Sequence, residues 1–276
     1  MPYQTIQPPI RGYTEQNAFS AVPPSALTVL PTCPFTNRTR LSVRPGFNVL
    51  HDFPEAGGPP AVAPMVQHVG TYSIYVSGIL EEMLLIVAGG LVYTMRTSEV
   101  TPVLASGQGS PLLQTTGLVE GVQFREYYYL VDGANYVKVK LDQATPACST
   151  WTGPASIAVS GVKASIIARF GARLALSGLK NTPNNWWLSA IDDPEDWTPT
   201  AGTPEDSIAG DSTAEYGQLG DPIVALIPFG ERGLLFGCTH SMTYLTSDPA
   251  FGDARMVEMS RTVGVVGPRA WCSGPE

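Results

Sequence analysis

Four stretches of the sequence repeat one short pattern, an apolar run followed by a glycine and then by an aromatic residue. The glycines are Gly89, Gly133, Gly178 and Gly237, and successive ones lie 44, 45 and 59 residues apart. A unit of about 45 residues is too small to bury its own hydrophobic face, so several units must stack against one another. Four-stranded blades arranged around an axis have this period. The repeat therefore predicts an all-β chain folded as a β-propeller, or as part of one.

The composition favours many turns and short strands. The 276 residues include 28 glycines and 25 prolines, and only 14% are charged. Glycine and proline are frequent in turns and are disfavoured inside helices. Long helices are therefore not expected.

Short alternating runs between turn residues predict the individual strands. In the first unit they are 71–76, 83–88, 91–95 and 100–104, and in the second 118–124, 126–131, 136–141 and a stretch around Trp151. The third unit covers 157–189 and the fourth 222–245, with further strands at 256–260 and 264–266. Four strands for each unit is the number that a blade requires.

The chain is predicted to have two parts. Residues 1–40 are broken by prolines but carry many apolar side chains, which predicts an extended arm that docks on a neighbouring surface. The propeller-type domain is expected at 41–276, either as a small or open ring or as a fragment whose remaining blades lie beyond Glu276. A hairpin of 40–44 and 47–50 is expected to open it, and residues 271–276 resemble the start of a further blade. The polar segment 192–221 is expected to extend from one face and bind something.

The charge balance limits the partners. The formal net charge is −8, and the sequence contains no cluster of lysines and arginines. Tight non-specific binding to nucleic acid needs cations that displace counterions from the phosphates. DNA is therefore not expected as a tight ligand, although an acidic wall lets DNA slide past without sticking.

The cysteines and the N-terminus indicate the compartment. The four cysteines, Cys33, Cys148, Cys238 and Cys272, form no C-x-x-C pair, so buried free thiols are expected and neither a zinc site nor a disulfide framework is. No signal peptide is evident, and the longest apolar run, near 83–92, is too short to span a membrane. Synthesis in a cytosol-like compartment follows.

The densest group of polar and aromatic residues lies at 184–198. The candidate interaction residues are Trp186, Trp187, Asp192, Asp193, Asp196 and Trp197, together with Arg40 and Arg44. A pair of carboxylates beside aromatic rings could serve a glycosidase. The favoured interpretation is structural: the aspartates accept hydrogen bonds from backbone amides in turns, and the tryptophans bury area between blades.

Signals for other chemistry are weak. The aspartates lack the alternating spacing and the glycine of a calcium-binding loop. None of His51, His68 and His240 lies in a nucleophile motif, and Cys238 with His240 is better explained as part of an ordinary strand. No catalytic residue, metal or cofactor is expected, so the chain is predicted not to be an enzyme.

Several motifs in a fixed order resemble a known family. They are LSVRPG at 41–46, RLALSG at 173–178, PNNWWLS at 183–189, DPEDW at 193–197, IPFG at 227–230 and LFGCTHS at 235–241. Together they resemble bacteriophage virion proteins of the tail-nozzle or packaged-DNA-stabilisation type. The likeness extends over most of residues 40–272.

The resemblance implies a non-enzymatic structural protein of a short-tailed phage, assembled in the host cytoplasm and located in the virion. It implies a β-propeller that forms a homo-oligomeric ring of about six copies on the portal and adaptor, with other tail proteins as neighbours. The genomic DNA would pass through this ring during ejection without specific binding. The important residues would then be those that pack blades and form interfaces.

Two other interpretations share the repeat pattern. A carbohydrate-binding or glycoside-cleaving propeller that recognises a receptor would also use Trp186, Trp187 and Trp197 with the neighbouring carboxylates. A propeller adaptor that binds peptides on one face is less favoured, because the Gly-His and Trp-Asp signatures of such repeats are missing.

Overall fold

The computed structural model of the chain describes residues 65–76, 79–96, 99, 101–141, 145–154, 162–200, 203–211, 217–230 and 233–272, together with four short strands nearer the N-terminus. By its internal contacts the chain divides into two compact units, Met1–Leu50 and His51–Glu276. Within the described part of the chain, none of the helical segments has the length and apolar character needed to span a bilayer.

The first unit contains two strand pairs among its described residues. Strand β1 (Tyr13–Thr14) pairs in parallel with β2 (Leu27–Thr28), and β3 (Phe35–Asn37) pairs antiparallel with β4 (Arg40–Leu41). Residues 40–41 of the strand predicted at 40–44 therefore pair with residues that precede them, and 42–44 lie outside the described residues. Residues 47–50, predicted as its hairpin partner, lie outside the described residues.

The second unit contains four sheets, each of four antiparallel strands connected in chain order, which we call blades 1 to 4. Blade 1 consists of β5 (Val66–Val76), β6 (Ile79–Ala88), β7 (Leu91–Arg96) and β8 (Val103–Leu104). Blade 2 consists of β9 (Glu120–Phe124), β10 (Tyr127–Val131), β11 (Tyr136–Lys140) and β12 (Ala147–Thr150). Blade 3 consists of β13 (Ile166–Phe170), β14 (Arg173–Ser177), β15 (Trp186–Leu188) and β16 (Ile208–Gly210). Blade 4 consists of β17 (Ile223–Phe229), β18 (Gly233–Cys238), β19 (Met242–Leu245) and β20 (Met256–Ser260).

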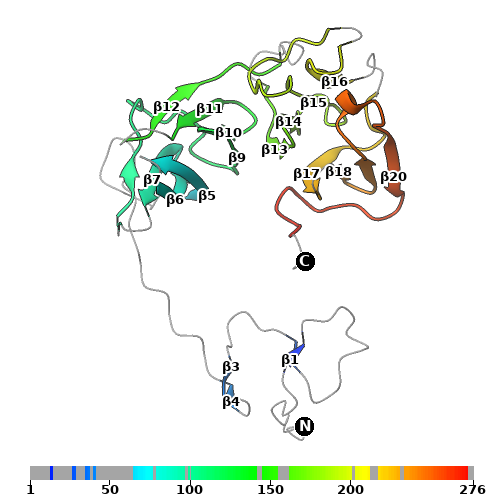
Figure 1. Ribbon diagram of the computed structural model, residues 1–276. Coiled ribbons are helices and arrows are strands. Elements are labelled where there is room, and N and C mark those ends of the chain that lie inside the picture. Colours follow the sequence, from blue (N-terminus) through cyan, green and yellow to red (C-terminus); the bar gives the residue numbers. More distant parts are fainter. Residues whose placement is uncertain are drawn as a thin grey trace, which may run out of the picture. The chain divides into compact units, whose positions relative to one another are not determined.

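The blades stack in the manner of a propeller. The first strands of successive blades contact one another, β5 with β9, β9 with β13, and β13 with β17. Figure 1 shows the four sheets following one another along an arc, from blade 1 in cyan to blade 4 in orange. The prediction of an all-β fold with four-stranded blades in a propeller-like arrangement is confirmed.

Three hydrophobic cores lie between neighbouring blades. Tyr72 and Leu85 of blade 1 pack with Leu130 of blade 2. A second core joins blades 2 and 3, and a third joins blades 3 and 4. Each sheet therefore buries one face against the next. A fourth, smaller cluster belongs to blade 1 alone and consists of Ile86, Ala88, Leu91 and Tyr93.

The repeated glycines do not all occupy equivalent positions. Gly89, Gly133 and Gly178 follow the second strand of blades 1, 2 and 3, and all three have a left-handed φ, between 57° and 86°. Glycine is favoured there because a side chain strains this conformation. Gly237 instead lies within β18, where an added Cβ would meet the side chain of Val265. The fourth glycine therefore keeps the motif but has a different role.

Two of the predicted boundaries are wrong. The third unit does not end at Ser189, because its fourth strand β16 lies inside the polar segment 192–221 that was expected to be an extension. Gly210 in β16 lets the strand pack against the ring of Trp186. Residues 264–266 do not form a strand; the Val265 amide donates to the Cys238 carbonyl (2.8 Å) in an irregular segment after blade 4.

Candidate functional site

The three predicted tryptophans lie in the cores between blades. Trp186 is buried between blades 3 and 4, with its ring centroid 5.2 Å from that of Phe236. Trp187 and Trp197 are buried between blades 2 and 3, where Trp197 stacks on Trp151 with ring centroids 6.2 Å apart. Rings in these positions bury large areas and do not form an exposed platform for a sugar.

Two of the predicted aspartates stabilise turns. The Asp193 carboxylate accepts from the Glu195 amide (3.1 Å), and the Asp196 carboxylate accepts from the Thr198 amide (2.9 Å). Such contacts are typical of aspartate in tight turns. Asp192 behaves differently: it has a left-handed φ of 59°, and its carboxylate forms an ion pair with Arg125 of the second blade (2.5 Å).

The turn 192–197 rests against blade 2 and makes a second ionic contact there. The Lys138 ammonium on β11 pairs with the Glu195 carboxylate and also lies 5.1 Å from the centre of the Tyr127 ring. The Tyr129 hydroxyl donates to Glu195 at 3.4 Å. Burial, together with the neighbouring Glu195 charge, raises the pKa of Tyr129 above its usual range, so the hydroxyl remains a donor at neutral pH.

A hollow of about 210 Å³ lies at this junction. It is lined by Phe124, Arg125, Glu126, Tyr127, Tyr129, Asp193, Pro194 and Glu195. Its volume is below the usual range of small-ligand sites. The carboxylates of Asp193 and Glu195 are already engaged, by an amide and by a lysine, whereas the Glu126 carboxylate has no hydrogen-bond or ion-pair partner among the described residues.

Blades 3 and 4 are joined by a buried arginine that sequence reasoning missed as a key residue. The Arg173 side chain, on β14, is fully buried, and its Nε donates to the Asp248 carboxylate at 2.7 Å. Its remaining nitrogens donate to the carbonyls of Ser189, Asp206 and Pro204 at 2.5–2.7 Å. The sequence signal was present, since Arg173 opens the RLALSG motif, but strand alternation gave no reason to bury a charge there.

A second arginine connects the segment after blade 4 to blades 1 and 2. Arg269 Nε donates to the Glu120 carboxylate (2.8 Å), and its NH2 nitrogen donates to the carbonyls of Val119 (2.7 Å) and Gln67 (3.0 Å). These groups are about 150 to 200 residues from Arg269 in the sequence. No local sequence pattern predicts contacts over such a separation. We call this contact the Arg269 clasp.

His68 lies beneath the Arg269 clasp in a buried hydrogen-bonded position. Its Nδ1 donates to the Val119 carbonyl (3.1 Å), which leaves Nε2 to accept from the Tyr128 hydroxyl (2.9 Å). Burial, helped by the charge of Arg269, lowers the pKa of His68 to about 4. This histidine is therefore neutral at pH 7, and its hydrogen bonds hold Val119 and Tyr128 of the interior in place.

Cys238 and His240 do not form a catalytic pair. Cys238 is buried, and burial raises the pKa of its thiol to about 11, whereas the His240 ring is largely exposed beside Asp221 (3.5 Å). Cys148 is also a buried free thiol, as expected, but Cys272 is exposed. Cys33 and His51 lie outside the described residues.

Two predicted site residues belong to the first unit. The backbone of Arg40 lies in β4, and its side chain is outside the described part of the chain. Arg44 lies outside the described residues. Among the described residues, no three histidines, cysteines or acidic side chains gather where they could hold a metal ion.

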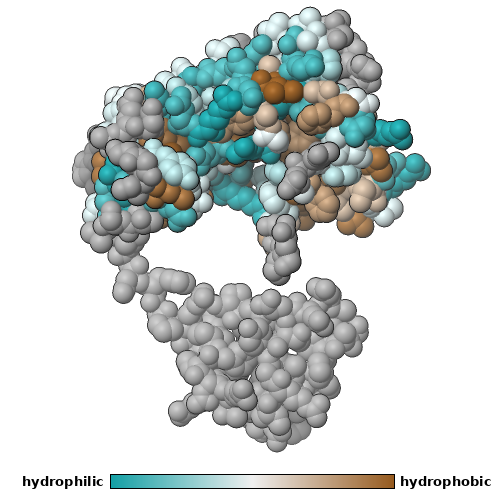
Figure 2. Space-filling model, viewed as in Figure 1, coloured by the Kyte–Doolittle hydropathy of each residue, from teal (hydrophilic) through white to brown (hydrophobic). Residues whose placement is uncertain are grey.

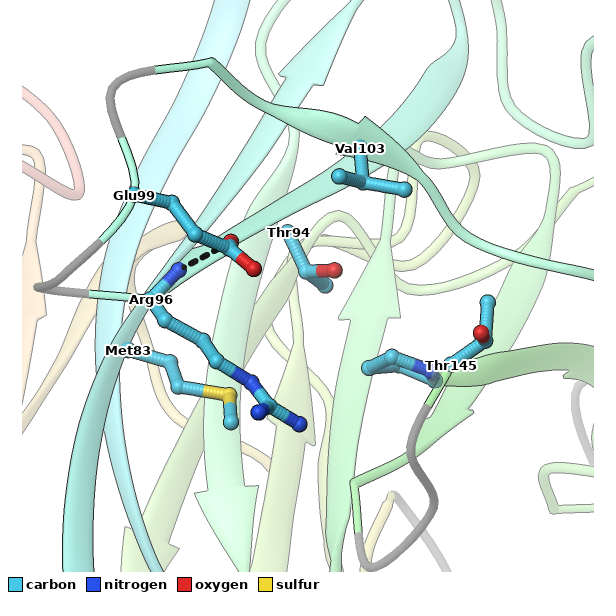
Figure 3. Close-up of a pocket in the computed structure, with 7 residues that line it drawn as sticks. Met83, Thr94, Arg96, Glu99, Val103 and Thr145 are labelled. Atoms are coloured by element: carbon cyan, nitrogen blue, oxygen red, sulfur yellow. Dashed lines mark hydrogen bonds between the residues drawn. The ribbon is translucent and has the colours of Figure 1, made fainter.

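A smaller hollow of about 40 Å³ lies between blade 1 and the start of β12 (Figure 3). It is lined by Met83, Thr94, Arg96, Glu99, Val103, Thr145 and Pro146. The Glu99 carboxylate accepts from the Arg96 amide at 2.8 Å, and the Arg96 guanidinium lies 3.7 Å from the Glu81 carboxylate. The volume of this hollow is far below that of ligand sites.

Comparison with known proteins adds no closer classification. No family model matches the sequence, and a search of curated proteins finds no significant match. The fold and the contacts define an all-β, propeller-like protein whose conspicuous polar and aromatic residues hold its blades together.

Proposed function

We propose that this protein is a non-enzymatic structural component of a short-tailed phage tail, of the nozzle or DNA-stabilising type. It assembles with copies of itself into a ring in the virion, on the portal and adaptor, and genomic DNA passes through that ring. The motif order that resembles this family is the starting point of the proposal.

The observation that carries the proposal is that residues of the family-like motifs pack the blades together. Arg173, which opens one motif, is buried in an ion pair and carbonyl contacts between blades. Trp187 and Trp197 belong to the core between blades 2 and 3, and Asp193 and Asp196 shape the turn that rests on it. Residues that are buried between blades or that stabilise turns favour a rigid structural protein over an enzyme.

The electrostatics support passage of DNA without capture. The net charge is −8, and several basic side chains are already paired with carboxylates, among them Arg125, Lys138, Arg173 and Arg269. Binding of phosphates requires cations that are free to replace counterions. A surface of this composition repels the DNA backbone, as a conduit must.

The test has three parts. Mass spectrometry of purified phage particles should find the protein in the virion, and native mass spectrometry of the purified protein should give a closed ring. Binding to duplex DNA at physiological salt should be negligible. A protein that is absent from particles and remains monomeric would contradict the proposal.

A second candidate is recognition of a glycan at the junction of blades 2 and 3. The hollow of about 210 Å³ with Tyr127 on its wall is the observation that favours this candidate. Tyr127→Ala should then abolish binding on a glycan array, whereas Tyr75→Ala on blade 1 should not. The absence of any glycan bound by the unmodified protein would eliminate this candidate.

A further inference from the structure

Large apolar side chains that are exposed gather on the two end blades. They are Met65, Val66, Val69, Tyr75, Leu80, Val103 and Leu104 in blade 1, Leu118 after it, Phe229, Phe251, Val257 and Met259 in blade 4, and Val263, Val266 and Trp271 beyond it. Among the described residues of 119–228, which contain blades 2 and 3, there is none. Figure 2 shows hydrophobic residues at both ends of the arc.

On blade 1 the most exposed of these side chains lie on the face turned away from blade 2. Strand alternation places Tyr72 and Met83 on the inner face, where they are buried in the core shared with blade 2. Val69, Tyr75 and Leu80 lie on the opposite face and are 58%, 74% and 51% exposed, whereas Ile86 and Tyr93, farther along the same face, belong to a small buried cluster. We call this the outward face of blade 1.

Blade 4 has a corresponding outward face. Leu226 and Phe236 point toward blade 3 and are buried there. The opposite face carries Phe229 and Val257, which are 61% and 40% exposed, and the Phe229 ring packs edge-on against Tyr244 with centroids 5.8 Å apart. Exposed apolar surface of this kind, confined to one sheet face, marks a contact site.

The two outward faces carry opposite, unpaired charges. Glu82 lies across from Ser73 on the outward face of blade 1 and is exposed. Arg255 precedes the inward-facing Met256 at the start of β20, so alternation places it on the outward face of blade 4, and it is also exposed. Neither side chain has a hydrogen-bond or ion-pair partner within the described part of the chain.

We propose that the outward face of blade 1 in one copy packs against the outward face of blade 4 in a second copy. Contacts between successive blades are already made three times inside the chain, and the new contact repeats this arrangement between molecules. The apolar residues provide buried area, and Glu82 meets Arg255 of the neighbour. A head-to-tail contact of this kind generates a ring when its rotation closes.

This inference rests on the self-assembly in the proposed function and identifies the surface responsible. The test uses the purified 276-residue chain and measures its assembly by mass photometry over a range of concentrations. Tyr75→Asp and Phe229→Asp should each abolish assembly, because each places a charge in the apolar contact. Glu82→Arg and Arg255→Glu should each weaken assembly by about tenfold or more, because each creates a like-charge pair.

Combining Glu82→Arg with Arg255→Glu should restore assembly to within a few-fold of the unmodified protein, since the pair is regenerated in reverse. Lys180→Glu, an exposed charge reversal on blade 3, is the matched control and should leave assembly unchanged. Thermal unfolding verifies that every variant is folded.

The outcomes separate this inference from the proposed function. If the protein assembles but none of the end-blade variants weakens assembly, the inference is overturned and the function stands. A monomeric protein that is nevertheless found in virions overturns the inference and the ring of the proposed function, but leaves its place in the virion. A monomeric protein that is absent from virions overturns both.

Discussion

The junction of blades 2 and 3 and the outward faces of blades 1 and 4 contain similar side chains in different surroundings. At the junction, Trp187 is buried and Lys138 is paired with Glu195. On the outward faces, Tyr75 and Phe229 are mostly exposed. The difference lies in what covers them, because every blade is built from the same kind of four-stranded sheet.

This contrast shows that a blade has two faces that can bury apolar area, and that burial depends on what lies against each. Among the described sheets, blades 2 and 3 have a neighbouring blade on both sides and blades 1 and 4 have one, and part of the outward face of blade 1 is buried in a small cluster. The charges of Lys138, Arg125 and Arg173 at the inner junctions are paired, but Glu82 and Arg255 on the outward faces have no partner among the described residues. Substitutions at the inner junctions should therefore lower stability most where the contact is most deeply buried.

Arg173→Met should give the largest loss of stability. It leaves the Asp248 carboxylate and three carbonyls without their buried donor. Removing one partner of a buried ion pair costs about 3–5 kcal/mol. The free energy of unfolding in guanidinium chloride measures this loss. Arg261→Ala removes an exposed ion pair with Glu258 and should leave the unfolding midpoint unchanged.

Stability should fall as the pH decreases from 6.5 toward 4, partly because of His68. The folded protein holds this pKa near 4, whereas the unfolded chain has the usual 6.5, so the unfolded state binds more protons between these values. The contribution is present above pH 6.5, is lost as the pH falls, and amounts to at most about 3 kcal/mol.

The measurement for His68 is the free energy of unfolding at several pH values, compared with that of His68→Gln. The variant should have a shallower slope between pH 4 and 6.5, because its side chain does not titrate. His240→Gln, at an exposed position, is the matched control. Equal slopes for both variants would refute the role of His68.

Gly210→Ala should destabilise the core between blades 3 and 4. The new Cβ would overlap the buried ring of Trp186. Overpacking of this kind costs about 1–3 kcal/mol. A thermal melt should show a lower midpoint, while Gly220→Ala, where a Cβ has no neighbour within 4 Å, should melt as the unmodified protein does. A normal melt for both would mean that the Trp186 ring has room to move.

Arg125→Ala should have the smallest effect at the inner junctions. Both Arg125 and Asp192 are more than half exposed, so water screens their ion pair. Exposed pairs contribute at most about 1 kcal/mol. Chemical denaturation measures the loss, and a value comparable to that of Arg173→Met would show that this rim contact holds the blades together.

Much of the fold could be predicted from the sequence, because strands and hairpins are local. The pattern around Gly89 and Gly133 predicted the hairpins of blades 1 and 2, where glycine adopts a left-handed φ. Strand β16 was missed because its three residues lie within a polar segment and are identified only by their pairing with β15.

The candidate site was predictable only in part. The structural interpretation of Asp193 and Asp196 follows from the short-range turn chemistry of aspartate, and both accept amide hydrogen bonds as expected. The Lys138–Glu195 pair and the Arg269 clasp join residues that are far apart in the chain. No local spacing encodes such contacts, since they depend on how whole blades stack.

The sequence by itself determined the strands, their turns and the all-β class, because backbone preferences and side-chain alternation act over a few residues. Tertiary structure alone decided which apolar faces became core and which remained exposed, and which charges found partners. Burial depends on a neighbouring sheet, and the position of that sheet is set by contacts between distant parts of the chain.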